Sequence, residues 1–420
     1  MTRSTSRLPQ GRLRALAAVA ALTALAASAC TTPGAAGQGS STGPGSTNSA
    51  APTTATPTPT APAVAFTPSV DEGATVPVDT VVSVAASGGS LTAVQLTYQD
   101  PKNGPQAVEG TIAPDGSTWT ARSLLEPGAN YTLAMTGVNV DGAQSTASRA
   151  FASQKLSKKQ QIYPRLAGDG ATVGVAMPVV VNFDVPVTDR ASFEKKMTVT
   201  SVPAQAGSWS WISNTEVHWR PENYWQPGTK VSVNLDLNSV PGGNGTYGQM
   251  SLAGGFTVGS ALTMKADLAA HQLTVTINGA VARTIPVTGG KRGWESRSGT
   301  KVIMEKFSTL KMDATTIGVE PGDPNYYSIP DVRYAMRETW SGEFLHAAPW
   351  SVGSQGRANV SHGCIGMSTG NAAWLFNQVK IGDPIVVTGT NRGLEKGNGW
   401  SDWNISYADF KAGSALAPKA

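Results

Sequence analysis

The stretch NVSHGCIGMS (359–368) places Cys364 two residues after His362. A cysteine thiol attacks acyl carbons well only as the thiolate, so at neutral pH it needs a base or a positive charge nearby. Of the four histidines in the chain, His346 and His362 lie within 18 residues of Cys364. Gly363 allows the backbone to come close to a reacting carbonyl, and main-chain N–H groups can then hold the developing oxyanion. These residue types predict acyl transfer on a cysteine nucleophile.

Two other interpretations of Cys364 compete with a nucleophile. A metal site needs three or four ligands in fixed geometry, and Cys364, His362 and His346 supply three without any CxxC or HxxxH spacing. An ordinary buried cysteine is the plainer alternative. However, exported proteins normally use cysteines in disulfide pairs, and Cys364 has no partner if the second cysteine, Cys30, is modified. A nucleophilic role accounts for the nearby histidines, for Gly363 and for the unpaired cysteine together, so we favour it. We expect no metal and no organic cofactor.

The N-terminal residues 1–29 have the pattern of a secretory signal peptide. Arginines precede the apolar run ALAAVAALTALAASAC, which is too short to span a bilayer comfortably and ends in small residues. The ending LAASAC is similar to a bacterial lipobox, in which Cys30 becomes the lipidated first residue. Cleavage at a nearby small residue with release from the membrane is the alternative. The expected location is outside the cell, anchored by lipid at Cys30 and facing the wall, or else secreted into the wall.

The charge of the chain is largely a property of this signal segment. Its four arginines match the whole net charge of +4, so the mature protein is near neutral. Binding to nucleic acid requires a cluster of basic residues on the protein. A near-neutral mature protein gives no sign of such a cluster, so we expect no nucleic-acid partner. Residues 30–63 contain Ser, Thr, Pro and Gly but no charged or aromatic residue. Such a segment cannot bury enough surface to fold, and we expect a disordered linker.

The next two segments repeat one another. EGATVPVDTVVSV (72–84) is similar to DGATVGVAMPVVVNF (169–183), and LEPGANYTLAM (125–135) is similar to WQPGTKVSVNL (225–235). Both copies consist of short β-branched or alternating runs between turn residues. Repeats of roughly 100 residues with this pattern indicate immunoglobulin-like sandwiches, which we place at 64–156 and 157–258. In the second copy, tryptophans 209, 211, 219 and 225 are expected in the core rather than at a glycan-stacking surface.

A third, β-rich domain is expected at 259–388. Asn278-Gly279 between alternating runs predicts a hairpin, and TKVIME and PIVVTG predict further strands. The segment 368–384 predicts the one notable helix, from its Ser/Thr start, its apolar spacing and its closing Gly and Pro. The tail 389–420 is dense in aromatic residues, so we expect it to pack on the catalytic domain. The predicted fold class is therefore mainly β.

The stretch HAAPWSVGSQGRANVSHGCIGMS (346–368) resembles the signature of the L,D-transpeptidases, the YkuD-type catalytic domain. The match covers His346, Ser361, His362, Gly363, Cys364 and Ile365. The chain also resembles the multi-domain members of this family, which build 3→3 cross-links in peptidoglycan. The resemblance lies in the two preceding sandwiches, the stretch SGEFLHAAPWSVG and the aromatic tail. The resemblance implies that Cys364 is the nucleophile and that His346 is the general base and later the general acid.

The resemblance also implies roles for neighbouring residues. The main-chain carbonyl of Ala347 is expected to orient the His346 imidazole, and His362 and Gly363 to shape the turn and the oxyanion hole. The expected substrate-binding residues are Tyr327, in a lid, together with Ser341, Gly342, Ser361 and Gly366. At Gly366 the chain departs from the asparagine that is common in the signature, which removes a substrate hydrogen bond. Asn359 and Ser368 are candidates to replace that amide.

The expected reaction releases D-alanine from a tetrapeptide stem, forms a thioester on Cys364 and passes the acyl group to an amine of a second stem. The partners are thus peptidoglycan stem peptides, and carbapenems are expected to acylate Cys364. An L,D-carboxypeptidase, in which water resolves the thioester, is the enzymatic alternative. A non-catalytic wall-binding protein is the alternative from another class. His218, on an alternating run, is expected at a surface or strand edge, and His271 is expected to be structural.

Overall fold

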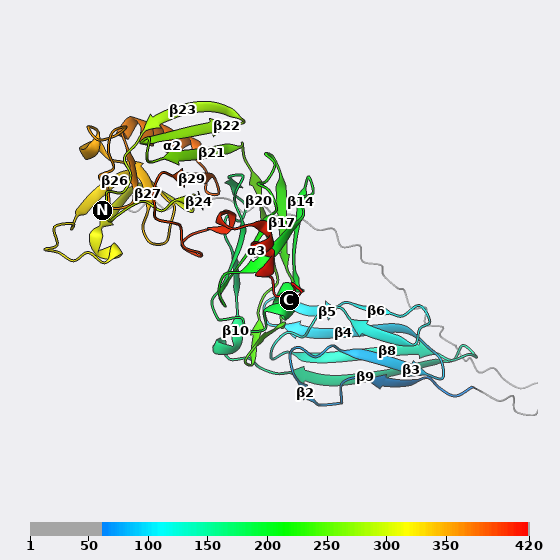
Figure 1. Cartoon of the computed structure of the whole chain (residues 1–420). Coiled ribbons are helices and arrows are strands. Elements are labelled where there is room, and N and C mark those ends of the chain that lie inside the picture. The colour runs from blue at the N-terminus through cyan, green and yellow to red at the C-terminus, as the bar shows by residue number, and fades with distance from the viewer. Residues whose placement is uncertain (1–60, 419–420) are drawn as a thin grey trace, which may run out of the picture. The chain divides into compact units, whose positions relative to one another are not determined.

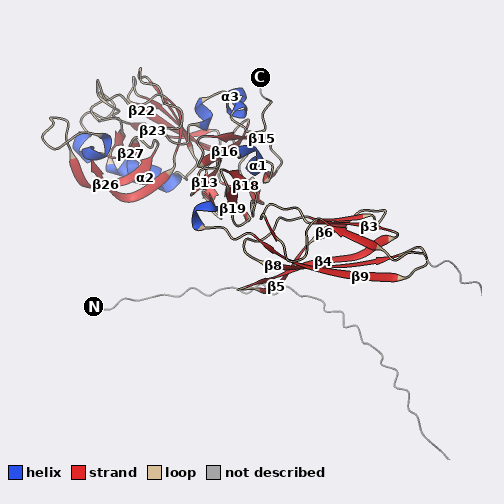
Figure 2. Ribbon diagram, turned by 90° about the horizontal axis from the view of Figure 1, so that it is seen from below, coloured by secondary structure: helices blue, strands red, loops and turns tan. Residues whose placement is uncertain are grey.

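The computed structural model describes residues 61–418 of the chain. Strands make up most of the regular structure, and the helices are few and short (Figure 2). Within these residues, no helix combines the length and the apolar character needed to cross a membrane. The predicted signal segment 1–29, the lipidation site Cys30 and most of the predicted linker lie outside the described residues.

The first sandwich consists of a four-stranded sheet, in the order β1-β3-β7-β6, and a five-stranded sheet, in the order β2-β9-β8-β4-β5 (Figure 1). Its strands are β1 (Ala65–Pro68), β2 (Thr75–Val76), β3 (Ser83–Ser87), β4 (Ser90–Asp100), β5 (Gly104–Val108), β6 (Gly110–Ile112), β7 (Thr118–Ala121), β8 (Asn130–Val138) and β9 (Gln144–Ser153). Buried and exposed residues alternate along β8, as a strand with one face on a core requires. Trp119, Tyr131 and Leu133 are part of that core.

The second sandwich has two four-stranded sheets, β11-β13-β16-β15 and β12-β20-β17-β14, and a small sheet, β10-β19-β18. Its strands are β10 (Gln161–Ile162), β11 (Pro164–Leu166), β12 (Thr172–Val173), β13 (Val179–Phe183), β14 (Met197–Val202), β15 (Gly207–Trp211), β16 (Glu216–Pro221), β17 (Lys230–Leu235), β18 (Pro241–Gly243), β19 (Thr246–Gly248) and β20 (Leu252–Val258). Its helices are η1 (Lys158–Gln160) and α1 (Arg190–Glu194).

The internal repeat occupies equivalent places in the two sandwiches. Strand β2 runs parallel to β9, and β12, which begins 97 residues after β2, runs parallel to β20. In both sandwiches the next strand, β8 or β17, is antiparallel to that partner. The similarity between the two sequence segments therefore reflects the same sheet order built twice.

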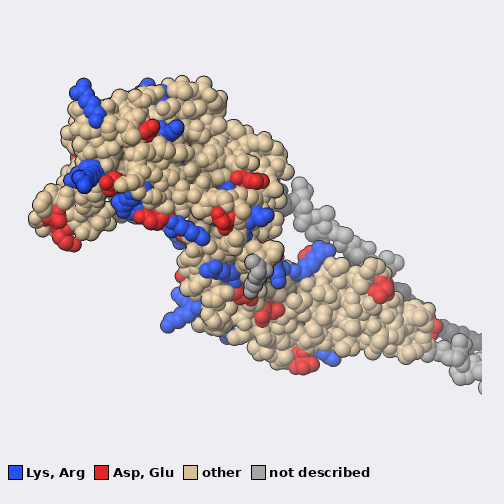
Figure 3. Space-filling view, viewed as in Figure 1, with Lys and Arg blue, Asp and Glu red and all other residues tan. Residues whose placement is uncertain are grey.

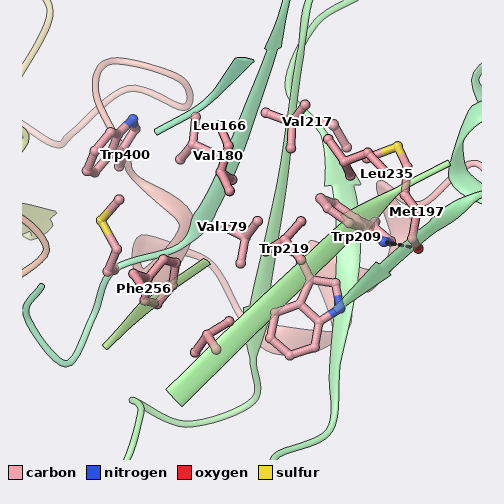
Figure 4. Close-up of a cluster of buried hydrophobic side chains, with 14 of the residues drawn as sticks. Leu166, Val179, Val180, Met197, Trp209, Val217, Trp219, Leu235, Phe256 and Trp400 are labelled. Carbon is pink, nitrogen blue, oxygen red and sulfur yellow. Dashed lines mark hydrogen bonds between the residues drawn. The ribbon is translucent and has the colours of Figure 1, made fainter. Parts of the chain in front are cut away.

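The four tryptophans of the second sandwich lie in its core, as predicted. Each of Trp209, Trp211, Trp219 and Trp225 is at most 7% exposed. Figure 4 shows Trp209 and Trp219 among the aliphatic side chains, with the Trp209 indole N–H donating to the Met197 carbonyl at 3.2 Å. Burial of the four rings leaves no stacking surface for a glycan at these residues.

The prediction that His218 lies at a surface or edge is wrong. Its side chain is 1% exposed, and its two ring nitrogens face the carboxylates of Asp402 and Glu216, each at 2.8 Å. Asp402 belongs to the C-terminal tail, which covers strand β16. The alternation of the strand indicated an outward face, but the sequence did not show that a distant segment would cover that face.

The third domain pairs a five-stranded sheet, β23-β22-β21-β29-β24, with a four-stranded sheet, β25-β26-β27-β28. Its strands are β21 (Leu262–Asp267), β22 (Gln272–Ile277), β23 (Ala280–Pro286), β24 (Gly299–Val302), β25 (Glu305–Asp313), β26 (Ser328–Arg337), β27 (Phe344–Ala347), β28 (Ile365–Met367) and β29 (Pro384–Thr388). Short helical turns are η2 (Ala314–Ile317) and η3 (Pro349–Ser351). A bridge between Thr288 and Gly366 connects the two sheets beside the cysteine.

The predicted hairpin is confirmed. β22 and β23 pair around Asn278 and Gly279, whose φ angles of 50° and 84° both lie in the left-handed region that a tight hairpin turn demands. The predicted helix begins as expected, with Ser368 capping α2 (Thr369–Gln378), but it ends before Gly382. Lys306 Nζ donates to the Phe376 and Val379 carbonyls, so a side chain from β25 takes up the last carbonyl groups and the helix stops there.

The C-terminal tail contacts more of the molecule than the sequence predicted. Asn398 bonds to Ser341 of the third domain, in agreement with the expected contact. The aromatic part, with η4 (Asp402–Asn404) and α3 (Tyr407–Ala412), also packs on the second sandwich. The Trp403 indole N–H donates to Ala176 O at 2.7 Å, and the Arg220 guanidinium lies 4.4 Å from the Trp403 ring centroid. The tail thus joins the two domains.

Candidate active site

Cys364 and His346 line one cavity of about 320 Å³ because of how two short strands pair. β27 carries His346, and β28 begins immediately after Cys364. The two strands run parallel, with Leu345 opposite Ile365 and His346 opposite Gly366. This register brings two residues that are 18 positions apart in the chain to the wall of the same cavity.

The His346 ring is held in one orientation by the backbone. Its Nδ1 lies 2.8 Å from the carbonyl oxygen of Ala347. Because a carbonyl can only accept, Nδ1 carries the hydrogen and Nε2 is the acceptor, which is the form that a general base needs. The ring of Trp350 stacks on the imidazole at 5.8 Å. Ala347 acts on the imidazole through its main-chain oxygen, so this role does not require the side chain of another residue type.

The surroundings of Cys364 favour the protonated thiol. Burial raises its pKa to about 12, and although the Phe344 N–H opposes this effect, the carboxylates of Glu343 and Glu338 add to it. The thiol donates to the Gly342 carbonyl, with Sγ and the oxygen 3.6 Å apart. Burial also lowers the pKa of His346. The residue types in the sequence predicted that a nearby base makes thiolate available, whereas these surroundings favour a neutral thiol beside a neutral imidazole at pH 7.

The turn that precedes Cys364 is stabilised by Ser361. The Ser361 hydroxyl donates to Cys364 O at 2.6 Å and accepts from the Gly363 N–H at 3.1 Å. Gly363 has φ +122°, where a side chain would be strained, and a Cβ there would lie 3.4 Å from Glu343. The hydroxyl predicted to bind substrate is thus engaged within the turn, and so is the N–H of Gly363.

His362 sits between two aromatic rings at the cavity. Trp294 meets it edge-on at 5.0 Å, and Tyr327 lies at 5.1 Å. Its Nε2 is buried and has no hydrogen-bond partner within residues 61–418. Lys291 contacts the segment around Tyr327, because its ammonium donates to the Asn325 side chain at 2.9 Å. The charged loop 291–299 therefore flanks the cavity rather than lying free in solvent.

Gly366 is a glycine for steric reasons. A Cβ at this position would stand 2.9 Å from the Ala348 methyl and 3.2 Å from Thr288 Cγ2, so no larger residue fits without movement. Neither candidate replacement for the missing amide is available. Asn359 accepts from the Gly289 N–H and bonds to His271, and Ser368 caps helix α2. His271 is structural, as predicted, because its ring supports the chain that leads to Cys364.

The structure reveals a buried ion cluster behind the cysteine that the sequence did not predict. Lys301, with no exposed side-chain surface, lies 2.8 Å from Glu338 and 2.7 Å from Glu343. Glu343 is also paired with Arg297 at 2.9 Å. Lys301 stands in the apolar run TKVIME, whose pattern indicates only a strand. A charged residue that is buried must have a partner, and a lysine within an apolar run is therefore a weak signal that such a cluster exists.

The predicted site residues fall into three groups. Tyr327, His346, Ser361, His362, Cys364 and Gly366 line the cavity together. Ala347, Gly342 and Gly363 act through their backbones beside it. Ser341 is exposed and turned toward the tail, where it bonds to Asn398. Sequence patterns did not single out Trp350, Met312 and Thr288, which also line the cavity. In the described part of the chain, no three His, Cys, Asp or Glu side chains gather as metal ligands would.

Comparisons with known proteins point to one group of enzymes. Residues 263–387 match the family described as the L,D-transpeptidase catalytic domain, YkuD, and residues 73–241 match a bacterial Ig domain. L,D-transpeptidase 2 of Mycobacterium tuberculosis is 38% identical over 354 residues, which is 84% of this chain and 85% of that protein. L,D-transpeptidase 5 of the same species is 33% identical, over 86% of this chain and 78% of that protein. A solved LD transpeptidase in complex with imipenem is 42% identical over 53% of this chain and 97% of its own, with a TM-score of 0.47.

Proposed function

The chain belongs to the L,D-transpeptidase family and is an acyltransferase, and we propose that it forms 3→3 peptidoglycan cross-links through a thioester on Cys364. One observation carries the assignment of roles. Cys364 and His346 line the same cavity, and the Ala347 carbonyl orients the imidazole so that its Nε2 is the acceptor.

In the first half-reaction the neutral thiol and the neutral imidazole act together. His346 Nε2 takes the Sγ proton as Cys364 attacks the carbonyl carbon of the L,D peptide bond next to the terminal D-residue of a tetrapeptide stem. A C–S bond forms and the C–N bond breaks. The imidazolium returns the proton to the leaving amine, and D-alanine departs. Because burial favours the neutral pair, thiolate forms as the substrate arrives rather than in the free enzyme.

The developing oxyanion needs N–H donors from the turn around Cys364. The Gly363 N–H already donates to Ser361, so neighbouring amides such as that of Cys364 are the donors we assign to this role. Gly363 contributes through its positive φ, which lets the turn form, and through the lack of a side chain against Glu343. His362, between Trp294 and Tyr327, closes the cavity on the side of the lid.

In the second half-reaction a side-chain amine of a neighbouring stem attacks the thioester. The amine loses a proton to His346, a C–N bond forms, the C–S bond breaks and the thiol is restored. Hydrolysis of the same thioester by water would make the chain an L,D-carboxypeptidase. Carbapenems mimic the acyl donor, so we also propose that they acylate Cys364; a relative in this family has been solved with imipenem bound.

The test is to incubate the purified chain with a tetrapeptide stem, with and without an amine acceptor, and to identify products by mass spectrometry. We expect a cross-linked dimer and free D-alanine, and neither from Cys364→Ala. A tripeptide as the sole product in the presence of acceptor would instead identify a carboxypeptidase. Unchanged tetrapeptide with the wild-type chain would contradict both.

We further propose that Cys30, which lies outside the described residues, carries a lipid that holds the enzyme at the outer face of the membrane. The proposal rests on the lipobox-like LAASAC and on the linker that follows. Cys30→Ser should move the protein from the membrane fraction to the medium. Identical fractionation of both forms would show that Cys30 is not an anchor.

A further inference from the structure

The surroundings of the Cys364 sulfur are set by a short loop between β26 and β27. The Cys364 thiol donates to the Gly342 carbonyl, with Sγ and the oxygen 3.6 Å apart. Gly342 has φ +95°, a conformation that strains other residues. The acceptor for the Cys364 thiol thus comes from this loop, and any shift of the loop moves it relative to the sulfur.

That loop is held from outside the catalytic domain, by Asn398 of the C-terminal tail. Asn398 Oδ1 accepts from the Ser341 N–H at 2.9 Å, and Asn398 Nδ2 donates to Ser341 Oγ at 2.9 Å. The same Nδ2 donates to Glu395 at 2.9 Å. Asn398 lies beyond residues 263–387, the part of the chain that matches the catalytic-domain family.

The tail also supports a second part of the site. Glu395 pairs with Arg297, and Arg297 pairs with Glu343 at 2.9 Å. Glu343 lies against Gly363, in the turn before the cysteine. One short tail segment, 395–398, therefore supports both the Ser341–Gly342 loop and, through two ion pairs, the Gly363 turn.

We propose that Asn398 is a positioning residue for the acyl transfer, supplied by the C-terminal tail, and that it fixes the Ser341–Gly342 loop against the Cys364 sulfur. This inference rests on the proposed function of Cys364. Asn398 acts on the sulfur only through Ser341, which it holds at both the N–H and the side chain. Reacting groups tolerate little displacement, so loss of this support slows the chemical step more than it weakens binding.

The experiment measures acylation of the full chain by imipenem, resolved into the maximal rate constant and the apparent dissociation constant. Asn398→Ala should lower the rate constant about tenfold and leave the dissociation constant within about twofold. Asn404→Ala is the matched control, since Asn404 also belongs to the tail but bonds to the Thr300 N–H at 3.0 Å and to Leu394 O at 3.5 Å, and not to the Ser341–Gly342 loop. It should leave both constants unchanged.

A rescue separates positioning from general stabilisation. Asn398→Asp keeps the size of the residue but places a carboxylate against Glu395, and it should slow acylation as Asn398→Ala does. Adding Glu395→Gln supplies an amide that can donate to the new carboxylate at position 398 and still accept from Arg297. The double variant should therefore regain most of the rate. These isosteric variants also serve if Asn398→Ala does not fold.

Three results would overturn the inference: an Asn398→Ala rate constant equal to that of Asn404→Ala, a loss confined to the dissociation constant, or no rescue by the double variant. A wild-type chain that imipenem does not acylate would instead refute the proposed function, and the positioning role would fall with it. Wild-type acylation with an unaffected Asn398→Ala would refute the positioning role alone.

Discussion

At the scale of single residues, the proposed chemistry depends on a thiol and an imidazole that are both uncharged before substrate binds. Burial raises the pKa of Cys364 to about 12 and lowers that of His346. A preformed thiolate–imidazolium pair would require the opposite shifts. The neutral pair also protects a lone thiol, since oxidation proceeds through the thiolate.

Alkylation by iodoacetamide tests the protonation state of Cys364. In a Cys30→Ser chain Cys364 is the single thiol, because the sequence has two cysteines. With its pKa near 12, the thiolate fraction and hence the alkylation rate should rise about tenfold per pH unit from pH 7 to 10. A rate that is already at its plateau at pH 7 would show that the thiol is ionised in the free enzyme.

The sequence was enough to single out the candidate reacting residues but not their supports. Cys364, His346 and Gly363 stand out because their types and spacing have chemical meaning. Ser361, in contrast, was expected to contact substrate, and its hydroxyl instead bridges the turn. Whether this hydroxyl bonds to a substrate or to the backbone of its own turn depends on differences in atomic position of a few tenths of an ångström. The sequence does not contain that information.

At the scale of elements, the buried ion cluster on β24 couples stability to the site. Lys301→Met would leave Glu338 without its cationic partner and Glu343 with Arg297 alone. Breaking a buried pair costs about 3–5 kcal/mol, so the free energy of unfolding should fall by that amount in urea titrations. Lys311→Met, which removes an exposed ion pair with Asp313, should leave stability unchanged.

A double variant provides the counter-test for the cluster. Combining Lys301→Met with Glu338→Gln removes the unpaired buried charge and should restore about 1–2 kcal/mol. If Lys301→Met alone proves neutral, the cluster is not a source of stability. The expected loss is thermodynamic and comes from desolvated carboxylates, so it should not depend strongly on salt.

Elements whose ends are set by their own turn residues could be predicted from the sequence. The ends of elements that are set by contacts with distant residues could not. The Asn278-Gly279 hairpin formed as expected, because both residues accept a positive φ. Helix α2 stopped short because Lys306, which is distant in sequence, caps its carbonyl groups. The start of this helix is determined by its own residues, whereas its end is determined by β25.

At the scale of the whole molecule, the C-terminal tail connects the second sandwich to the catalytic domain. His218 on β16 meets Asp402 of the tail, and Arg220 lies over the rings of Trp403 and Phe410. Both signs of charge are interspersed on the face shown in Figure 3, in keeping with a small net charge. These contacts were beyond the reach of sequence patterns, since His218 and Asp402 are 184 positions apart.

Stability at alkaline pH tests the contact between the sandwich and the tail. Burial alone would lower the pKa of His218, but Asp402 and Glu216 outweigh it and raise the pKa to about 9. A raised folded-state pKa stabilises the protein fully below 6.5, and this stabilisation is lost as the pH rises through about 9. The difference in unfolding free energy between wild type and His218→Gln should therefore be about 1–3 kcal/mol at pH 6 and shrink by pH 10.

Chemical denaturation of the two proteins at several pH values measures this difference. Glu216 and Asp402 are common to both proteins, so the comparison isolates the imidazole. A difference that is constant from pH 6 to 10 would mean that His218 is not charged in the folded state. The same tail carries Asn398, so this contact also anchors the segment that we propose to position the Ser341–Gly342 loop.

The most direct test of the central claim is intact-mass analysis after incubation with imipenem, followed by peptide mapping. We predict that wild type gains the mass of one imipenem on the peptide that contains Cys364, that Cys364→Ala gains none, and that His346→Ala is acylated far more slowly than wild type. An adduct on Cys364→Ala, or a wild-type chain that remains unmodified, would contradict the assignment of Cys364 as the nucleophile.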